Sequence, residues 1–156
     1  MKTLVLGAGK YQRVEGAEHQ DQFPFDGIDH VFDLNKDWVI DGFAPLPKNT
    51  YDRILAIHVV EHLKSLIHFM DNCHDILPEG GTLTIETPNA GVNPDLEFCD
   101  PTHIRLYRPY TFHNYFTPEG IAKFGYTNKA WEFILVETFQ MEVQDDCIRV
   151  IATPIK

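Results

Sequence analysis

The chain has little of what a secreted, membrane-spanning or nucleic-acid-binding protein needs. Its three cysteines have no C-x-x-C spacing, so neither a disulfide framework nor a cysteine metal site is indicated. No apolar run approaches the ~20 residues that span a bilayer, and no signal-peptide pattern precedes the first apolar segment. Lys and Arg number 13 against 23 Asp and Glu, and this net charge of -10 argues against nucleic acid as a partner. We therefore expect a cytoplasmic protein with no membrane contact.

A chain of 156 residues is most simply one domain, spanning residues 1–156. Its most regular part is the stretch 51–89. Residues 53–57 are a short apolar run, which predicts a buried strand. From residue 59 to residue 77 the apolar positions recur at helical spacing, which predicts a helix with Glu61 on its polar side.

A Pro-Glu-Gly-Gly sequence ends that predicted helix, and residues 82–87 predict a second strand. A strand, a helix and a strand in this order form a right-handed crossover with parallel strands. The pattern therefore indicates an α/β sheet. Ligands bind such sheets where the strands end, so the junction 57–62 is the first place to look for chemistry.

The beginning of the chain has a weaker nucleotide-binding pattern. Residues 3–6 predict a strand that enters the turn Gly7-Ala8-Gly9, but Gln12 stands where G-x-G-x-x-G has its third glycine. Residues 16–21 predict the next strand, which leaves too few residues for a normal crossover helix between the two strands.

Two further segments complete this half of the sheet. Asp21 ends the second predicted strand, where a carboxylate accepts ribose hydroxyls in other doubly wound nucleotide binders, although a helix cap or a solvated Asp is the plain alternative. Residues 28–34 predict a third strand, which ends in Asp33-Leu34-Asn35.

The last third of the chain is less regular. Residues 109–116 read as a short amphipathic segment, and residues 117–124 as a short helix with Thr117 as its cap. Residues 131–142 and 147–153 predict a closing antiparallel hairpin.

The junction contains a possible metal motif. Residues 58–62 read His-Val-Val-Glu-His and match H-x-x-E-H, a zinc protease signature that needs both histidines on one helix. Because a strand runs up to Ile57, we expect His58 to lie before the helix that carries His62. The sequence therefore predicts no metal site, and eight histidines in the chain make a chance match common.

The order of these segments, with VVEHL, LPEGGTLTIETPN and DPTHIR as its most specific pieces, resembles the class I S-adenosylmethionine-dependent methyltransferases. The closest likeness is to the small members related to the methyltransferase 11 and 23 groups. This resemblance covers nearly the whole chain. It implies a Rossmann-like sheet, mostly parallel with a C-terminal antiparallel hairpin, and S-adenosyl-L-methionine as the cofactor.

The resemblance also implies the site. Cofactor-binding residues would be Leu6, Gly7, Ala8 and Gly9 near methionine and ribose, Asp21 at the ribose, Asp33 and Leu34 at the adenine, and Ile57 and His58 beside the methyl donor. Glu61 and His62 would either stabilise the turn or face the acceptor, and both are candidate catalytic residues.

His103 of DPTHIR is the third candidate catalytic residue. It follows the strand 82–87 and so lies on the acceptor side, where a neutral imidazole held by Asp100 can take a proton from the acceptor. A structural histidine that ties the loop to the backbone is the alternative.

The function that we expect is methyl transfer to a small-molecule acceptor, such as a sugar or another hydroxyl or amine compound. Aromatic residues after Asn89 suit a ring-shaped acceptor, or else pack in the core: Phe98, Tyr107, Tyr110, Phe112, Tyr115 and Phe116. Because no helix precedes the first strand, that side of the pocket needs another cover, which either a partner subunit of a homo-oligomer or the region 90–128 would supply. A cofactor-binding protein without catalytic activity is the second hypothesis, and a nucleic-acid base methyltransferase is a third.

Overall fold

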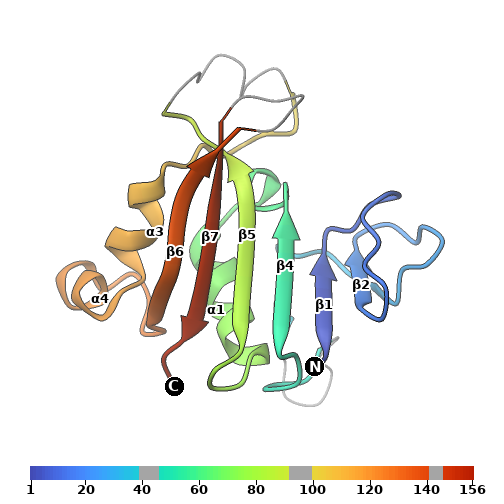
Figure 1. Ribbon diagram of the computed structural model, residues 1–156, viewed down its shortest axis with the longest axis horizontal. Helices are drawn as coiled ribbons and strands as arrows, with labels where there is room; N and C mark the ends of the chain where they lie inside the picture. The colour runs from blue at the N-terminus through green and yellow to red at the C-terminus, as the bar shows by residue number, and fades with distance from the viewer. Residues whose placement is uncertain (39–45, 92–99, 141–145) are drawn as a thin grey trace.

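The computed structural model describes residues 1–38, 46–91, 100–140 and 146–156. Its centre is a seven-stranded sheet of order β3-β2-β1-β4-β5-β7-β6 (Figure 1). The strands are β1 (Thr3–Leu6), β2 (Glu18–Asp21), β3 (His30–Val31), β4 (Arg53–Ile57), β5 (Thr82–Pro88), β6 (Trp131–Phe139) and β7 (Cys147–Pro154). The helices are η1 (Val60–His62), α1 (Leu66–Ile76), α3 (Pro109–Tyr115) and α4 (Pro118–Phe124).

Strand directions confirm the predicted fold class. The pairs β1–β2, β1–β4, β2–β3 and β4–β5 are parallel, whereas β7 pairs antiparallel with both β5 and β6. The arrows of β1, β4 and β5 therefore point to the same edge of the sheet (Figure 1). This edge is where a doubly wound sheet binds its ligand.

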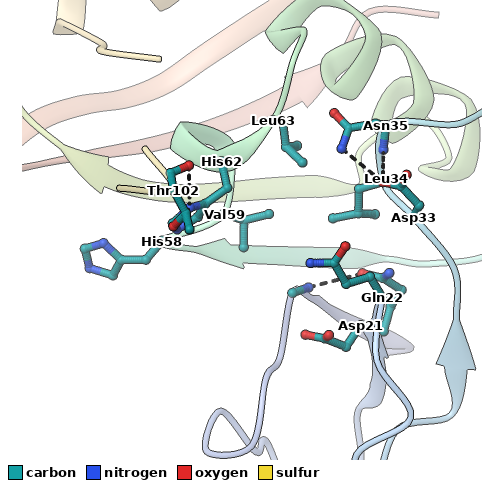
Figure 2. A pocket seen from close by; sticks show the side chains of 12 residues that line it. Asp21, Gln22, Asp33, Leu34, Asn35, His58, Val59, His62, Leu63 and Thr102 are labelled. Atoms are coloured by element: carbon teal, nitrogen blue, oxygen red, sulfur yellow. Dashed lines mark hydrogen bonds between the residues drawn. The ribbon is translucent and has the colours of Figure 1, made fainter. Parts of the chain in front are cut away.

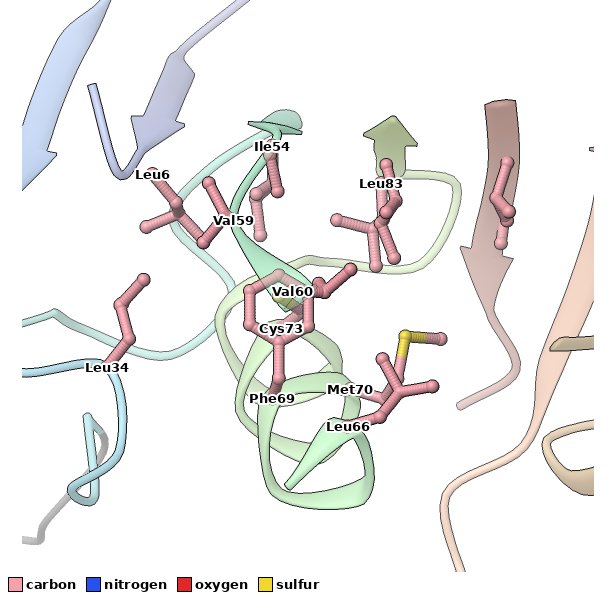
Figure 3. Packing of buried hydrophobic residues seen from close by; sticks show 14 of the residues in the cluster. Leu6, Leu34, Ile54, Val59, Val60, Leu66, Phe69, Met70, Cys73 and Leu83 are labelled. Carbon is pink, nitrogen blue, oxygen red and sulfur yellow. The ribbon is translucent and has the colours of Figure 1, made fainter. Parts of the chain in front are cut away.

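Helix α1 supplies most of the core on one face of the sheet. Its apolar residues Leu66, Phe69, Met70 and Cys73 face the sheet, and Figure 3 shows them against Ile54 and other strand residues. Each fully buried side chain of this size contributes about 1.5 to 3 kcal/mol. Packing under β4 and β5 therefore holds the central crossover unit in place.

The predicted helix 59–77 is wrong in one respect, because it is two helices. Leu63 is extended (φ -94°, ψ 145°), which ends η1, and Ser65 begins α1 by accepting a hydrogen bond from the His68 backbone nitrogen at 3.2 Å. The prediction of Glu61 on the polar side is also wrong, since this residue is 1% exposed. The break turns η1 across the edge of the sheet, where Glu61 contacts other loops.

The remaining elements agree with the sequence in kind but not always in length. The strands predicted over 16–21 and 28–34 are shorter in the structure, beginning at Glu18 and covering only His30–Val31. The short helix is confirmed, and Thr117 caps it by accepting from the Gly120 nitrogen. The hairpin is confirmed over β6 and β7, and its predicted residues 141 and 142 lie outside the described part.

Among the described helices, none is both long and apolar enough to cross a membrane. Phe98, one of the aromatic residues named for the acceptor, lies outside the described residues.

A hydrogen-bonded cluster around Glu18 joins β2 to the start of the chain and to β4. The Glu18 carboxylate lies 2.8 Å from Lys2 Nζ and 2.7 Å from His30 Nε2, and it accepts from the Tyr51 hydroxyl at 2.5 Å. Burial alone raises the pKa of Glu18, but the hydrogen bonds from these three side chains outweigh it and lower the pKa from 4.5 to about 2.

Because the pKa of folded Glu18 lies below its unfolded value, the carboxylate stabilises the fold above about pH 4.5 and loses this effect as the pH falls toward 2. We expect Glu18→Gln to cost about 1 kcal/mol at pH 7, allowing for partial exposure to solvent. The difference from the parent should shrink below pH 4.5. Urea unfolding at several pH values measures it, and a difference that stays constant down to pH 2 would contradict the assignment.

Candidate active site

A cavity of about 430 Å³ opens at the edge of the sheet where β1, β2 and β4 end. This volume lies within the range of small-molecule and cofactor sites. In Figure 2, Asp21 and Gln22 lie on one side of the space and His62 and Thr102 on another. The lining is formed by Gly7, residues 20–22, 33–35, 58–59 and 62–63, and Thr102.

The turn after β1 is fixed by the side chains of β2. The Gly7 backbone nitrogen donates to Gln20 Oε1 at 3.2 Å, and the Gly9 nitrogen donates to Asp21 Oδ2 at 2.9 Å. Asp21 Oδ1 accepts from the Phe23 nitrogen at 2.9 Å. A carboxylate has about four acceptor sites, so Asp21 retains capacity for a ligand hydroxyl at the cavity wall.

The segment after β3 forms a second wall. Asp33 Oδ1 accepts from the backbone nitrogen of Asn35 at 2.9 Å and from its Nδ2 at 3.0 Å. The backbone hydrogen bond from Asn35 is the main cause that lowers the pKa of Asp33, which is therefore a carboxylate at neutral pH. Asn35 Oδ1 accepts from the Lys64 nitrogen at 2.9 Å, so this wall is tied to the start of α1.

The turn after β4 brings His58 and Glu61 together. His58 has a left-handed backbone (φ 55°), which is strained for a residue with a side chain, and its Nδ1 lies 3.2 Å from Glu61 Oε1. Glu61 Oε2 accepts from the Thr87 hydroxyl at 3.0 Å. Glu61 therefore links η1 to the end of β5 while remaining buried.

Residues 100–103, which follow β5 in the chain, lie beside η1, and Thr102 lines the cavity there. Thr102 lies against His62, with Thr102 Oγ1 at 3.0 Å from His62 Nδ1. The rings of His62 and His103 pack edge to face, with their centroids 4.8 Å apart. His103 Nε2 is 3.8 Å from Asp100 Oδ2. The hydroxyl and backbone nitrogen of Thr102 lower the pKa of Asp100. The histidines His62 and His103 and the carboxylates of Glu61 and Asp100 thus lie close together at this end of the site.

The comparisons with known proteins agree with this geometry. Residues 9–124 match the family model described as a methyltransferase domain. The chain belongs to this methyltransferase family. No curated protein sequence matches it.

Three solved structures have the same fold. A SAM-dependent methyltransferase from Archaeoglobus fulgidus is 17% identical, with 97% of this chain and 85% of that chain covered and a TM-score of 0.65. The N-methyltransferase NodS from Bradyrhizobium japonicum WM9 is 12% identical, with coverages of 99% and 86% and a TM-score of 0.62. The trans-methyltransferase CalH, solved with SAH, is 15% identical, with coverages of 98% and 51% and a TM-score of 0.63. The predicted family and fold are thereby confirmed, and S-adenosylmethionine is the cofactor that this assignment gives the methyltransferase.

The structure brings together some of the residues predicted to bind the cofactor. Those that line the cavity are Gly7, Asp21, Asp33, Leu34 and His58. The others do not reach its surface. Leu6 is buried in the core, and Ala8 packs with Val5 and Leu55 on the other side of the turn. Gly9 contacts Asp21, and the Ile57 carbonyl accepts from Gln12 Nε2 at 2.9 Å.

The three candidate catalytic residues also lie at different depths in the methyltransferase. His62 lines the cavity, Glu61 is buried behind it, and His103 packs against the His62 ring. The separation of His58 from the helix that follows is confirmed, since His58 precedes η1. The one-helix zinc motif therefore does not form.

The aromatic residues proposed for acceptor binding lie elsewhere. Tyr107, Phe112 and Phe116 are buried in the core, which favours the packing alternative for these three. Tyr110 is exposed on α3, and Tyr107, Tyr115 and Phe116 line a separate apolar cavity of about 280 Å³.

The structure adds Gln22, Asn35 and Thr102 to the site. Asn35 belongs to the sequence Asp33-Leu34-Asn35, and Thr102 directly precedes His103 in DPTHIR. Their closeness to these candidate residues was the sequence feature that could have indicated them.

Gly7 and Gly9 provide a matched pair for testing the turn. Both have left-handed backbones (φ 61° and 57°), but a Cβ on Gly7 would lie 2.6 Å from Val59 Cγ2, while a Cβ on Gly9 would meet nothing within 4 Å. Because Val59 is β-branched and stiff, we expect Gly7→Ala to cost about 1 to 3 kcal/mol more than Gly9→Ala in urea unfolding. Adding Val59→Ala to Gly7→Ala should recover part of the difference. Equal costs for the two single variants would show that the close approach to Val59 does not matter.

Proposed function

We propose that the methyltransferase transfers the methyl group of S-adenosylmethionine to a small-molecule acceptor that carries a hydroxyl or amine. The convergence of Gly7, Asp21, Asp33 and Leu34 on one cavity is the observation that supports this proposal. These residues come from the ends of three neighbouring strands, the arrangement expected for a nucleotide in a doubly wound sheet.

We assign Asp21 to the ribose hydroxyls and the side chain of Leu34 to the adenine face, with Asp33 at the adenine edge. Leu34 is 7% exposed and so offers an apolar surface at the cavity wall. The methionine part then lies toward Gly7 and His58. A side chain at Gly7 would clash with Val59. Because glycine has no side chain, the backbone itself lies at the ligand space.

The acceptor lies at the other end of the cavity, beside His62 and Thr102. Its nucleophilic atom attacks the methyl carbon, the carbon–sulfur bond breaks, and the electron pair moves to sulfur to give S-adenosylhomocysteine. The sulfonium is already activated, so alignment of acceptor, methyl and sulfur supplies much of the rate. A hydroxyl or amine acceptor also loses a proton, and we propose Glu61, His62 and His103 as the catalytic group that activates it.

The lining supports a small acceptor over a nucleic acid. Among the described residues that line the cavity there is no Lys or Arg, while Asp21 and Asp33 are both carboxylic. A nucleic acid would therefore find no cation at the cavity to neutralise its phosphates.

Cofactor binding tests the assignment of Asp21. We expect Asp21→Asn to weaken S-adenosylmethionine binding about 10- to 100-fold, since the ribose hydroxyls lose a charged acceptor. Calorimetry measures the affinity, and a melting curve confirms that the variant is folded. Asp26→Asn is the control, because Asp26 is exposed and lies outside the lining. Parental affinity in a folded Asp21→Asn variant would remove Asp21 from the site.

Turnover tests the acceptor end. A panel of hydroxyl and amine compounds, assayed by formation of S-adenosylhomocysteine, identifies acceptors. With any acceptor so found, we expect His103→Ala to keep its cofactor affinity and to lose roughly 10²- to 10⁴-fold in turnover. A parental rate in His103→Ala would exclude a catalytic part for His103. A lower melting temperature together with weaker cofactor binding would instead indicate a structural role.

A further inference from the structure

Three side chains with metal-binding atoms converge at the acceptor end of the cavity. Glu61 and His62 come from η1, His103 comes from the segment after β5, and one ligand atom from each lies within 4.8 Å of the other two. We propose that Glu61, His62 and His103 bind a divalent transition-metal ion, and that this ion binds the acceptor oxygen. The inference rests on the proposed methyl transfer and states how the acceptor is activated.

The two segments that carry the ligands are joined by backbone hydrogen bonds. The carbonyl of Glu61 accepts from the Ile104 nitrogen at 3.0 Å and from the Arg105 nitrogen at 3.2 Å. The Tyr107 hydroxyl donates to the Val60 carbonyl at 3.2 Å. His103 is therefore held beside Glu61 and His62 by the fold, as a preorganised site requires.

The contacts of Nδ1 indicate the tautomer of a neutral His62 ring. Thr102 has one hydroxyl hydrogen, and it is donated to Asp100 Oδ1 at 2.6 Å. The oxygens that His62 Nδ1 contacts, Thr102 Oγ1 at 3.0 Å and the Thr102 carbonyl at 3.3 Å, are then both acceptors. Nδ1 must therefore carry the ring hydrogen, and Nε2 of the neutral ring has the free electron pair.

This is the arrangement of a metal-ligating histidine. Such histidines usually donate their other ring N–H to a carbonyl or a carboxylate-linked group, which fixes the tautomer and orients the ring. Thr102 and Asp100 act here as positioning residues for His62, and they stand next to His103 in the chain.

Glu61 brings the negative charge that a cation needs. It is 1% exposed, and among the described residues the ion pair that its carboxylate makes is with His58, at 3.2 Å. A buried carboxylate is costly unless a cation or hydrogen bonds compensate for it. Its bonds to Thr87 and His58 leave acceptor sites for a metal.

Two imidazoles and one carboxylate are the ligand set of several catalytic zinc sites, in which a fourth position stays open for water or substrate. Bonds of about 2.0 to 2.2 Å put tetrahedral ligand atoms about 3.4 Å apart, so the three side chains would draw together by small rotations. Imidazole nitrogens favour Zn²⁺ and its transition-metal neighbours over Mg²⁺.

The bound ion would act as a Lewis acid on the acceptor. A hydroxyl on the metal loses its proton to solvent water more readily, and its oxygen keeps the electron pair. That oxygen forms the new bond to the methyl carbon while the carbon–sulfur bond breaks and its pair goes to sulfur.

Metal titration of the whole chain tests the proposal without an acceptor. After treatment with a chelator, we expect calorimetry to show one Zn²⁺ per chain, and Co²⁺ to give the strong visible absorption of a tetrahedral site. His62→Ala and His103→Ala should each weaken Zn²⁺ binding at least about 10-fold. His113→Ala is the control, because His113 is an exposed histidine on α3.

Glu61→Gln keeps the shape of the buried side chain and removes its charge, so it should also weaken Zn²⁺ binding if it folds as the parent does. A parent protein that binds Zn²⁺ no more tightly than His62→Ala overturns the proposal. Calorimetry with S-adenosylmethionine on the metal-free protein separates a failure of the metal site from a failure of the proposed methyl transfer. Cofactor binding without metal binding overturns only the metal site, whereas absent cofactor binding overturns the proposed methyl transfer.

Discussion

The buried side chain of Glu61 is the contact on which the acceptor half of the site depends. Its two oxygens reach His58 at 3.2 Å and Thr87 at 3.0 Å, and its carbonyl accepts the backbone of Ile104 and Arg105. One residue thus joins the end of β4, the end of β5 and the segment after β5. A carboxylate in this position is costly to bury alone, so its contacts with His58 and Thr87 offset the loss of water.

The cofactor half depends on side-chain hydrogen bonds, because the connection between β1 and β2 is short. Arg13 donates to the carbonyls of Ala8 at 3.4 Å, Gly9 at 3.1 Å and Asp26 at 2.7 Å. Gln12, which replaces the third glycine of the motif, donates to the Ile57 carbonyl at 2.9 Å. Side chains therefore hold the turn that a crossover helix usually holds, and they tie it to β4.

Sequence patterns predicted the parts of the fold that local chemistry determines. A few neighbouring residues determine each of four features: the apolar run of β4, the glycine stop after α1, the Thr117 cap and the hairpin. The strand–helix–strand pattern indicated a parallel α/β sheet, since such crossovers are right-handed, and the family resemblance implied the mostly parallel sheet with its antiparallel hairpin. The order of the seven strands comes from the structure.

The same patterns failed where distant contacts decide. Glu61 occupies a polar position on a helical wheel, but Thr87 and Ile104 bury it, and the helix breaks at Leu63. Thr102 enters the site through its contact with His62, 40 residues earlier in the chain. No period in the sequence encodes such pairs, since each member looks like an ordinary surface residue on its own.

The two halves of the site meet at Val59 and Leu63, which are both buried and both line the cavity. Val59 lies against Gly7 of the cofactor half, and Leu63 follows the η1 residues of the acceptor half. In the proposed assignment the cofactor half consists of residues 7–35 together with His58, and the acceptor half of residues 61–62 and 100–105. The side chain of Asp21 bonds to Gly9 and Phe23, both within residues 7–35, so we expect substitutions in the acceptor half to leave Asp21 in place. Function resides in sites carried by a fold rather than in the fold itself, so a sheet of this kind is compatible with different acceptors.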